Sequence, residues 1–415
     1  MKSVNLSKES NPLKLFKNTK SMCESSSGQN LRIVYFFSLI LVGCMFFFSS
    51  NRIAIAQTVH IPDPTLRAVF ESALDKKGGD DITQADMASL EVLRASRCLF
   101  LRLSKLGGWG IPNRWICGPT DDTFGPPIRD LTGLEFAINL TELHLGHNRL
   151  SDVSPLENLT NLVFLDLGSN WRLSDVSPLK NLTNLTFLNL RENRLSDVSA
   201  LKNLTKLIEL ELQLNQLSDV FPLQDLTTLK YLDLRENQLS DVSPLKDLMN
   251  LTHLNLRDNH LSDVSPLKDL TNLTHLNLQL NEISDASLLG NLTKLVFLDL
   301  DSNKLSDISP LRNLTRMNRL DISDNEISDV SPLSGLIRLR RLDIDDNPMS
   351  DVSPLRGLTN LTFLDLDDNQ ILDISPLSGL IRLTWLDLDD NQISDITPLS
   401  SLTALTYLDL DGNEI

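Results

Sequence analysis

A 22-residue repeat constrains the fold of this chain more than any other feature of its sequence. Thirteen copies begin at residues 140, 162, 185, 207, 229, 251, 273, 295, 317, 339, 361, 383 and 405. Only the step from 162 to 185 is 23 residues long, because Trp171 is inserted before Arg172. Repetition at this period is typical of a solenoid, in which each unit contacts only its neighbours.

One full copy starts at Leu251 and reads LTHLNLRDNHLSDVSPLKDLTN, with an LxxLxLxxNxL core. The alternation over Leu254-Asn255-Leu256 predicts a short strand with its leucines on one face. One such strand cannot bury its leucines alone, so we expect neighbouring copies to stack in parallel around a shared core. In the SDVSPL segment, Asp263 or Ser265 can bond nearby backbone N–H groups, and Pro266 fixes φ for a turn or 3₁₀ stretch.

An asparagine recurs at the ninth position of every copy. Its amide can both donate to and accept from backbone groups of adjacent turns, which would otherwise be buried without a partner. We therefore expect a structural ladder made of Asn148, Asn170, Asn193, Asn215, Asn237, Asn259, Asn281, Asn303, Asn325, Asn347, Asn369, Asn391 and Asn413.

These motifs resemble the leucine-rich-repeat family, and most closely its bacterial internalin-like class, over roughly residues 57–415. The resemblance implies an α/β fold, a curved solenoid with a parallel β-sheet on the concave face, a 3₁₀ or irregular convex side, and a helical N-terminal cap. In the cap, Asp63 and Pro64 make a good helix start, and Thr83 and Asp86 can start a second helix. The resemblance also implies protein binding or adhesion through the concave sheet.

The expected organisation has a cap and a zeroth-repeat strand in residues 57–95 and the solenoid in residues 128–415. Residues 96–127 interrupt the zeroth repeat and are expected to form a folded loop. A disulfide between Cys98 and Cys117 would contribute roughly 3 kcal/mol in an oxidising compartment, mostly by restricting the unfolded chain. The loop is either a contact element or a cover for the first turn.

The N-terminal segment, residues 1–56, is expected to direct export to the cell surface, the periplasm or the medium. A basic leader precedes an apolar run from Ile33 to Phe48, and Ala54-Ile55-Ala56 fits a signal peptidase. An uncleaved signal anchor and a lipoprotein acylated at Cys44 remain open as alternatives. At the other end Ile415 stops in mid-repeat, which we interpret as truncation rather than pairing with another chain.

The concave face is where we expect function, because the third, fifth and seventh residues of each repeat should face outward there. Nine of the thirteen third-position residues are aromatic or histidine. Exposed aromatic side chains often anchor interfaces, although a row of them can instead stack to stabilise the sheet. The candidate contacts are Phe164, Phe187, Tyr231, His253, His275, Phe297, Phe363, Trp385 and Tyr407.

Carboxylates fill the fifth and seventh positions toward the C-terminus. The net charge is −17, and residues 295–415 alone hold 22 acidic against 9 basic side chains. Such a surface repels nucleic acid and anionic lipid and favours a basic protein partner, with calcium binding and a merely solubilising role as alternatives. We assign no metal site, because DLDDN lacks the loop glycine and distal glutamate of an EF-hand. The candidate carboxylates are Asp343, Asp365, Asp367, Asp387, Asp389 and Asp409.

The sequence offers little material for catalysis. His253 beside His275, and His144 near His147, have no convincing third partner, and no nucleophile with a base, phosphate loop or zinc spacing is present. We therefore expect a recognition or adhesion module that is not an enzyme and needs no cofactor. The rival hypothesis is a calcium-stabilised structural or adhesive spacer at the cell surface.

Overall fold

A computed structural model describes residues 57–96, 98–102, 113–117 and 126–415. The chain divides into two compact units, residues 1–57 and 58–415, and the fold below is that of the second unit. The expected export segment, residues 1–56, lies outside the described residues. Among the described residues, no helix has the length and apolar character needed to cross a membrane.

The helical cap predicted for the N-terminus is confirmed. Helix α2 covers Pro64–Ala73, and the Asp63 carboxylate accepts hydrogen bonds from the backbone N–H groups of Thr65 and Leu66. The other oxygen of Asp63 accepts from the N–H of Arg129 at 2.8 Å, which ties the helix start to the first return path. Helix α3 covers Gln84–Met87 and begins with a reciprocal capping box between Thr83 and Asp86.

The predicted parallel solenoid is also confirmed, as one 14-stranded sheet in which each strand pairs with the next copy along the chain. Every strand is three residues long and occupies the third to fifth positions of its repeat, so equivalent residues face each other across strands. The sheet begins with a zeroth-repeat strand, β1, and its strands are β1 (Val92–Arg94), β4 (Glu142–His144), β5 (Phe164–Asp166), β6 (Phe187–Asn189), β7 (Glu209–Glu211), β8 (Tyr231–Asp233), β9 (His253–Asn255), β10 (His275–Asn277), β11 (Phe297–Asp299), β12 (Arg319–Asp321), β13 (Arg341–Asp343), β14 (Phe363–Asp365), β15 (Trp385–Asp387) and β16 (Tyr407–Asp409).

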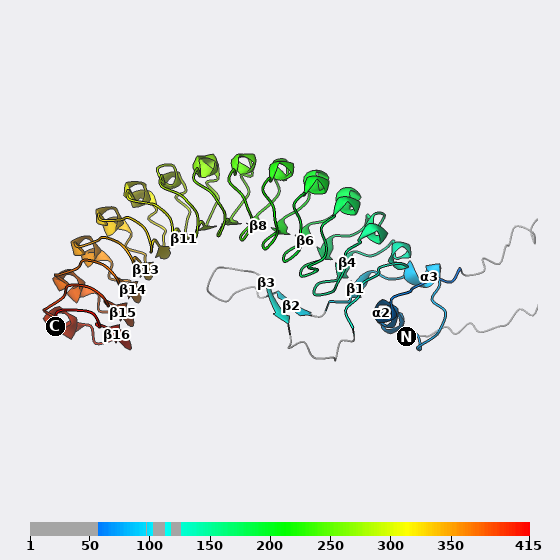
Figure 1. The fold of residues 1–415 in the computed structure, drawn as a ribbon, viewed down its shortest axis with the longest axis horizontal. Helices are drawn as coiled ribbons and strands as arrows, with labels where there is room; N and C mark the ends of the chain where they lie inside the picture. Colours follow the sequence, from blue (N-terminus) through cyan, green and yellow to red (C-terminus); the bar gives the residue numbers. More distant parts are fainter. Residues whose placement is uncertain (1–56, 97, 103–112, 118–125) are drawn as a thin grey trace, which may run out of the picture. The chain divides into compact units, whose positions relative to one another are not determined.

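The return paths form short 3₁₀ helices on the outer side of the arc of repeats, whereas the strands lie on its inner side (Figure 1). Each path starts with a carboxylate that accepts from the N–H two residues on, as Asp263 does from Ser265 at 2.8 Å. The helices are Leu134–Phe136, Ser154–Leu156, Ser177–Asn181, Ser199–Asn203, Phe221–Leu223, Ser243–Leu245, Ser265–Asp269, Leu289–Asn291, Ser309–Asn313, Ser331–Gly335, Ser353–Gly357, Ser375–Gly379 and Thr397–Ser401.

The core is a continuous column of aliphatic side chains. In the repeat that starts at Leu251, the leucines at 251, 254, 256, 261, 267 and 270 are all inaccessible to solvent. Each buried leucine contributes about 1.5–3 kcal/mol relative to an exposed one. A single cluster extends from the cap, through Phe70 and Leu93, to Leu402 in the last complete repeat.

The ninth-position asparagines join consecutive repeats through their side-chain amides. Asn259 Nδ2 donates to the carbonyl of Leu256 in its own repeat and to that of Leu234 in the preceding one, both at 3.1 Å. Its Oδ1 accepts from the N–H of Leu239 at 2.9 Å. Because the next asparagine repeats these contacts, each sixth-position carbonyl from Leu145 to Leu388 accepts from two side-chain amides. The ladder thereby provides partners for the buried polar groups of the turns.

Two further polar ladders run along the entrance to the strands, and we did not expect them. Asparagines just before the repeat start donate to the preceding repeat, as Asn250 does to the carbonyl of Thr227 at 2.8 Å. Threonines at the second position do the same through Oγ1, as Thr252 does to Lys230 at 3.0 Å. Both ladders are exposed, so hydrophobic periodicity gave no sign of them.

The segment expected to form a loop contains a two-stranded antiparallel ribbon, made of β2 (Cys98–Arg102) and β3 (Asn113–Cys117). The register of the ribbon pairs Cys98 with Cys117 at its open end. Cysteines at directly opposed positions have Cα atoms about 4.5–5.5 Å apart, which suits a disulfide. The disulfide itself stays a prediction.

Candidate functional site

The third-position side chains of the sheet stack on one another along the solenoid. Phe363 and Trp385 lie 3.9 Å apart between ring centroids with planes 4° from parallel, and Trp385 and Tyr407 lie 4.8 Å apart at 6°. A second stack joins Phe164 to Phe187 at 4.3 Å. The rings therefore stack to stabilise the sheet, which is the alternative to an open row of interface anchors. Stacking leaves mainly the ring edges accessible to a partner.

Two arginines lie over aromatic rings of the neighbouring strands. The Arg341 guanidinium lies 3.5 Å from the centroid of Phe363, and that of Arg319 lies 5.1 Å from Phe297. These contacts are cation–π interactions, which stabilise the positions of the arginines. Each arginine also reaches the carboxylate two residues on, with Arg341 bonding to Asp343 at 3.0 Å.

Exposure of the third-position aromatic residues differs from what we expected. Phe187 and Phe297 are buried, and the expectation that they are exposed is wrong for these two. Tyr407 is 40% exposed, while Phe164, Tyr231, Phe363 and Trp385 are half-buried. The reason is that rings in register on strands about 4.8 Å apart cover one another. Among the described aromatic residues of this position, Tyr407 on the last strand is the most exposed, and it stacks on Trp385, which stacks on Phe363.

The fifth-position side chains lie on the same face of the sheet as the third-position ones, but over most of the sheet they are buried, so they offer less open surface than we expected. Asp299, Asp321 and Asp343 are each less than a tenth exposed. The fifth residue ends its strand, and its side chain turns back to accept the N–H of the seventh residue, as Asp365 does from Asp367 and Asp387 from Asp389. These aspartates therefore perform turn chemistry as well as lining the face.

Burial and crowding raise the pKa values of this carboxylate column. Desolvation raises the pKa of Asp299 and of Asp365 to about 7, with neighbouring carboxylates adding to the effect. For Asp343 the same two causes raise the pKa to about 8. Asp367, in the seventh position, has its pKa raised to about 6 mainly by desolvation. These carboxylates therefore retain protons at a higher pH than freely exposed aspartates do.

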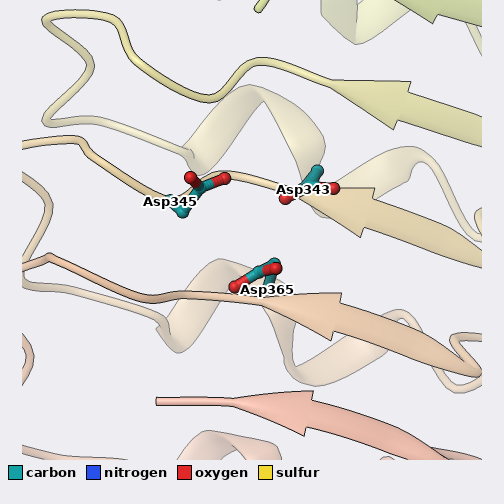
Figure 2. Close-up of side chains that lie close together, drawn as sticks. All are labelled: Asp343, Asp345 and Asp365. Atoms are coloured by element: carbon teal, nitrogen blue, oxygen red, sulfur yellow. The ribbon is translucent and has the colours of Figure 1, made fainter. Parts of the chain in front are cut away.

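One group of three carboxylates has the spacing of a metal site among the described residues. Single oxygens of Asp343, Asp345 and Asp365 lie within 4.8 Å of one another, and Figure 2 shows them gathered at the ends of two adjacent strands. Hard oxygen ligands suit calcium. However, Arg341 already bonds to Asp343, and three carboxylates are fewer than the six to eight ligands that calcium takes.

Each of the two central histidines contacts the threonine that precedes it. Thr252 Oγ1 lies 3.0 Å from the carbonyl of Lys230 and 2.9 Å from His253 Nδ1. Thr274 contacts His275 in the same way, and the two rings stack at 4.3 Å. Desolvation lowers the pKa of His253 to about 4 and lowers that of His275. Burial therefore favours the neutral form of both rings.

The remaining candidate residues cluster around the C-terminal stack. Tyr407 donates its hydroxyl proton toward Asp409 at 3.1 Å and Asp387 at 3.3 Å, which links the aromatic row to the acidic column. Asp389 and Asp367 follow in the seventh position of the same repeats. The structure thus brings the C-terminal aromatic and acidic candidates together on the last four strands. Phe164 and Phe187 lie on strands several repeats earlier.

Comparison with known proteins gives the family. A family model described as "Leucine Rich repeats (2 copies)" matches nine overlapping segments between residues 138 and 379, and one described as "Leucine rich repeat" matches residues 359–415. The crystal structure of the internalin InlF from Listeria monocytogenes is 35% identical, with a TM-score of 0.75, over 84% of this chain and 96% of that one. This chain is an internalin-like leucine-rich-repeat protein.

Two other solved structures are also similar to this internalin-like chain. The functional domain of InlJ from Listeria monocytogenes is 25% identical, with a TM-score of 0.70, over 87% of this chain and 73% of that one. The plant peptide hormone receptor RGFR1, solved in complex with RGF2, is 26% identical, with a TM-score of 0.59, over 68% of this chain and 53% of that one. The curated proteins contain no match. Internalin-like solenoids are typically scaffolds for protein–protein interaction.

Proposed function

We propose that this internalin-like protein is an exported recognition or adhesion module that binds a basic protein through its last four repeats. The observation that carries the proposal is the stack of Phe363, Trp385 and Tyr407 beside two columns of aspartates. Export rests on the N-terminal segment, residues 1–56, and fractionation of cells that express the full chain tests it.

The chemistry of the surface favours lysine and arginine side chains. Ring edges provide apolar contact for the aliphatic part of such a side chain, and the neighbouring carboxylates receive its charged end. The carboxylates repel one another, so a cation between them relieves a standing electrostatic cost. The complex of RGFR1 with RGF2 supports a protein or peptide as the class of ligand for this fold.

Replacing Phe363, Trp385 and Tyr407 together by alanine is expected to weaken partner capture at least about tenfold while the circular dichroism spectrum stays that of the native chain. The measurement is a pull-down from the native surroundings of the cell with the full chain, comparing the variant with the unchanged protein. Phe221→Ala is the matched control, because Phe221 is 59% exposed on an outer 3₁₀ helix. Undiminished capture by the folded triple variant would refute the proposal.

A calcium-stabilised spacer is the second candidate, and the grouping of Asp343, Asp345 and Asp365 favours it. On this hypothesis, adding calcium raises the melting temperature by about 3 °C or more. A suitable concentration is about 2 mM, on the order of the dissociation constants of weak extracellular calcium sites. Replacing the three aspartates by asparagine abolishes that rise. The control replaces Asp285, Asp307 and Asp329 on the outer turns, where the calcium effect should persist. A melting temperature that does not respond to calcium rules the candidate out.

A further inference from the structure

The inserted residue Trp171 forms an unusual surface cluster on the turns that follow β4, β5 and β6. Its indole ring is 45% exposed. The Arg172 guanidinium lies 4.6 Å from the ring centroid and that of Arg194 lies 5.8 Å from it. Arg149 occupies the equivalent exposed turn of the preceding repeat. We call Trp171, Arg149, Arg172 and Arg194 the Trp–Arg patch.

The insertion is not explained by packing. In the regular repeats the ninth-position Oδ1 accepts from a leucine N–H twenty residues earlier, as Asn215 does from Leu195 at 3.0 Å. After the insertion, the N–H of Leu173 bonds instead to the carbonyl of Asn170, and Asn193 Oδ1 is left buried with no hydrogen-bond partner. The chain therefore loses a buried hydrogen bond and gains an exposed tryptophan, a combination that points to function rather than stability.

The three arginines are available to a ligand. Among the described residues, Arg149, Arg172 and Arg194 make no side-chain hydrogen bond and no ion pair, in a chain whose net charge is −17. The acidic groups of the same turns are engaged already. Glu192 accepts from Ser169 at 2.7 Å, and Asp175 accepts from the N–H of Ser177 at 2.8 Å. Neither carboxylate therefore pairs with Arg149, Arg172 or Arg194, whose guanidinium groups have no ion-pair partner among the described residues.

We infer that the Trp–Arg patch binds an acidic, extended segment of a partner protein, separately from the concave surface. Guanidinium groups match planar carboxylates in a bidentate geometry. Tryptophan and arginine are the residues most enriched at the energetic centres of interfaces. Since guanidinium groups lie over the indole ring, its flat face is less open to stacking with a sugar, which favours a peptide over a polysaccharide. Three consecutive repeats span about 10 Å, the length of three or four extended residues.

The test is binding of fluorescein-labelled hexaglutamate to the full chain, followed by fluorescence anisotropy. Arg172→Gln combined with Arg194→Gln is expected to weaken binding about tenfold, because charge-assisted contacts are lost. The matched control is Arg316→Gln combined with Arg338→Gln, which removes the same charge from exposed positions of later repeats and should leave binding within about twofold. Trp171→Ala should also weaken binding, while Trp171→Phe should retain most of it.

Three outcomes would overturn the inference. The first is that the chain does not detectably bind hexaglutamate, and the second is that the two pairs of arginine substitutions weaken binding equally. The third is that Arg172 and Arg194 bind dextran sulfate more tightly than hexaglutamate, which would assign the patch to an anionic polysaccharide. Binding of labelled hexalysine, measured in parallel, tests the acidic concave surface of the proposed function. The two peptides therefore show separately whether the Trp–Arg patch or the concave surface fails to bind.

Discussion

Asn259→Leu is expected to lower the free energy of unfolding by about 2–4 kcal/mol, although leucine has nearly the same size as asparagine. The substitution leaves the N–H of Leu239 buried without an acceptor, because Asn259 Oδ1 is its partner. It also removes one of the two donors to each of the carbonyls of Leu234 and Leu256. Urea unfolding followed by circular dichroism measures the loss.

The matched control is Asn250→Leu, which removes an asparagine that donates to the Thr227 carbonyl in an exposed position. Water can replace that bond, so the expected loss is below about 1 kcal/mol. If the two substitutions destabilised the protein equally, the buried ladder would not be what joins the repeats. Hydrogen exchange should show the loss centred on the repeats beside Asn259, since each unit contacts only its neighbours.

The second prediction is that the melting temperature rises by about 5 °C when the pH falls from 8.5 to 6.5. Asp299 and Asp343 have folded-state pKa values of about 7 and about 8, above those of the unfolded chain. Folding therefore favours their protonated forms, and their stabilising contribution is lost as the pH rises through these values. Each pKa unit corresponds to about 1.4 kcal/mol. Glu211 and Asp166, with pKa values raised by burial to about 8 and about 7, act in the same direction.

Below pH 6.5 other groups oppose this gain. Burial lowers the pKa values of His144, His253 and His275, so the unfolded state takes up protons there before the folded state does. The aspartates of the outer turns, such as Asp307, have pKa values lowered by the backbone and hydroxyl groups of serine, and their contribution is lost only at still lower pH. Because the carboxylates with raised pKa values outnumber these three histidines, the rise in stability is expected to continue below pH 6.5 with a smaller slope.

Replacing Asp299, Asp321 and Asp343 by asparagine should at least halve the rise between pH 8.5 and 6.5. The control replaces Asp307, Asp329 and Asp373 on the outer turns, where serine lowers the pKa values, and should keep the full rise. Differential scanning calorimetry across the pH range gives both curves. An unchanged rise in the first variant would show that this carboxylate column does not control the stability of the sheet.

The repeat made most of the fold predictable. The repeat period predicted the solenoid, and the alternation of leucines predicted where each strand lies. Both features follow from the need to bury apolar side chains between stacked repeats. The start of α2 could be predicted from Asp63 and Pro64, because capping is a local interaction. The exposed ladders of Asn250 and Thr252 could not, because those residues also occur in ordinary loops.

The candidate site was harder to predict than the fold. Alternation correctly put Phe363 and Asp365 on the same side of the strand as each other, but it carries no information on how much of a side chain its neighbours cover. Asp299 is buried, whereas Asp365, which ends its strand in the same way, is only half-buried, and the repeat pattern does not distinguish the two. Trp171 was visible only as an irregularity in the period, and its contacts with two arginines depend on the shape of the turn.

The extra residue at Trp171 also shows how a protein of this architecture can diversify. Strands β5 and β6 remain in register across the longer step, with Phe164 still opposite Phe187. The extra residue at that turn therefore leaves the packing of the leucine core unchanged. Its effect on the asparagine ladder is the hydrogen bond that the side-chain amide oxygen of Asn193 lacks. Any repeat can accept a similar addition independently of the others, so new surface chemistry can be added one turn at a time without redesigning the interior.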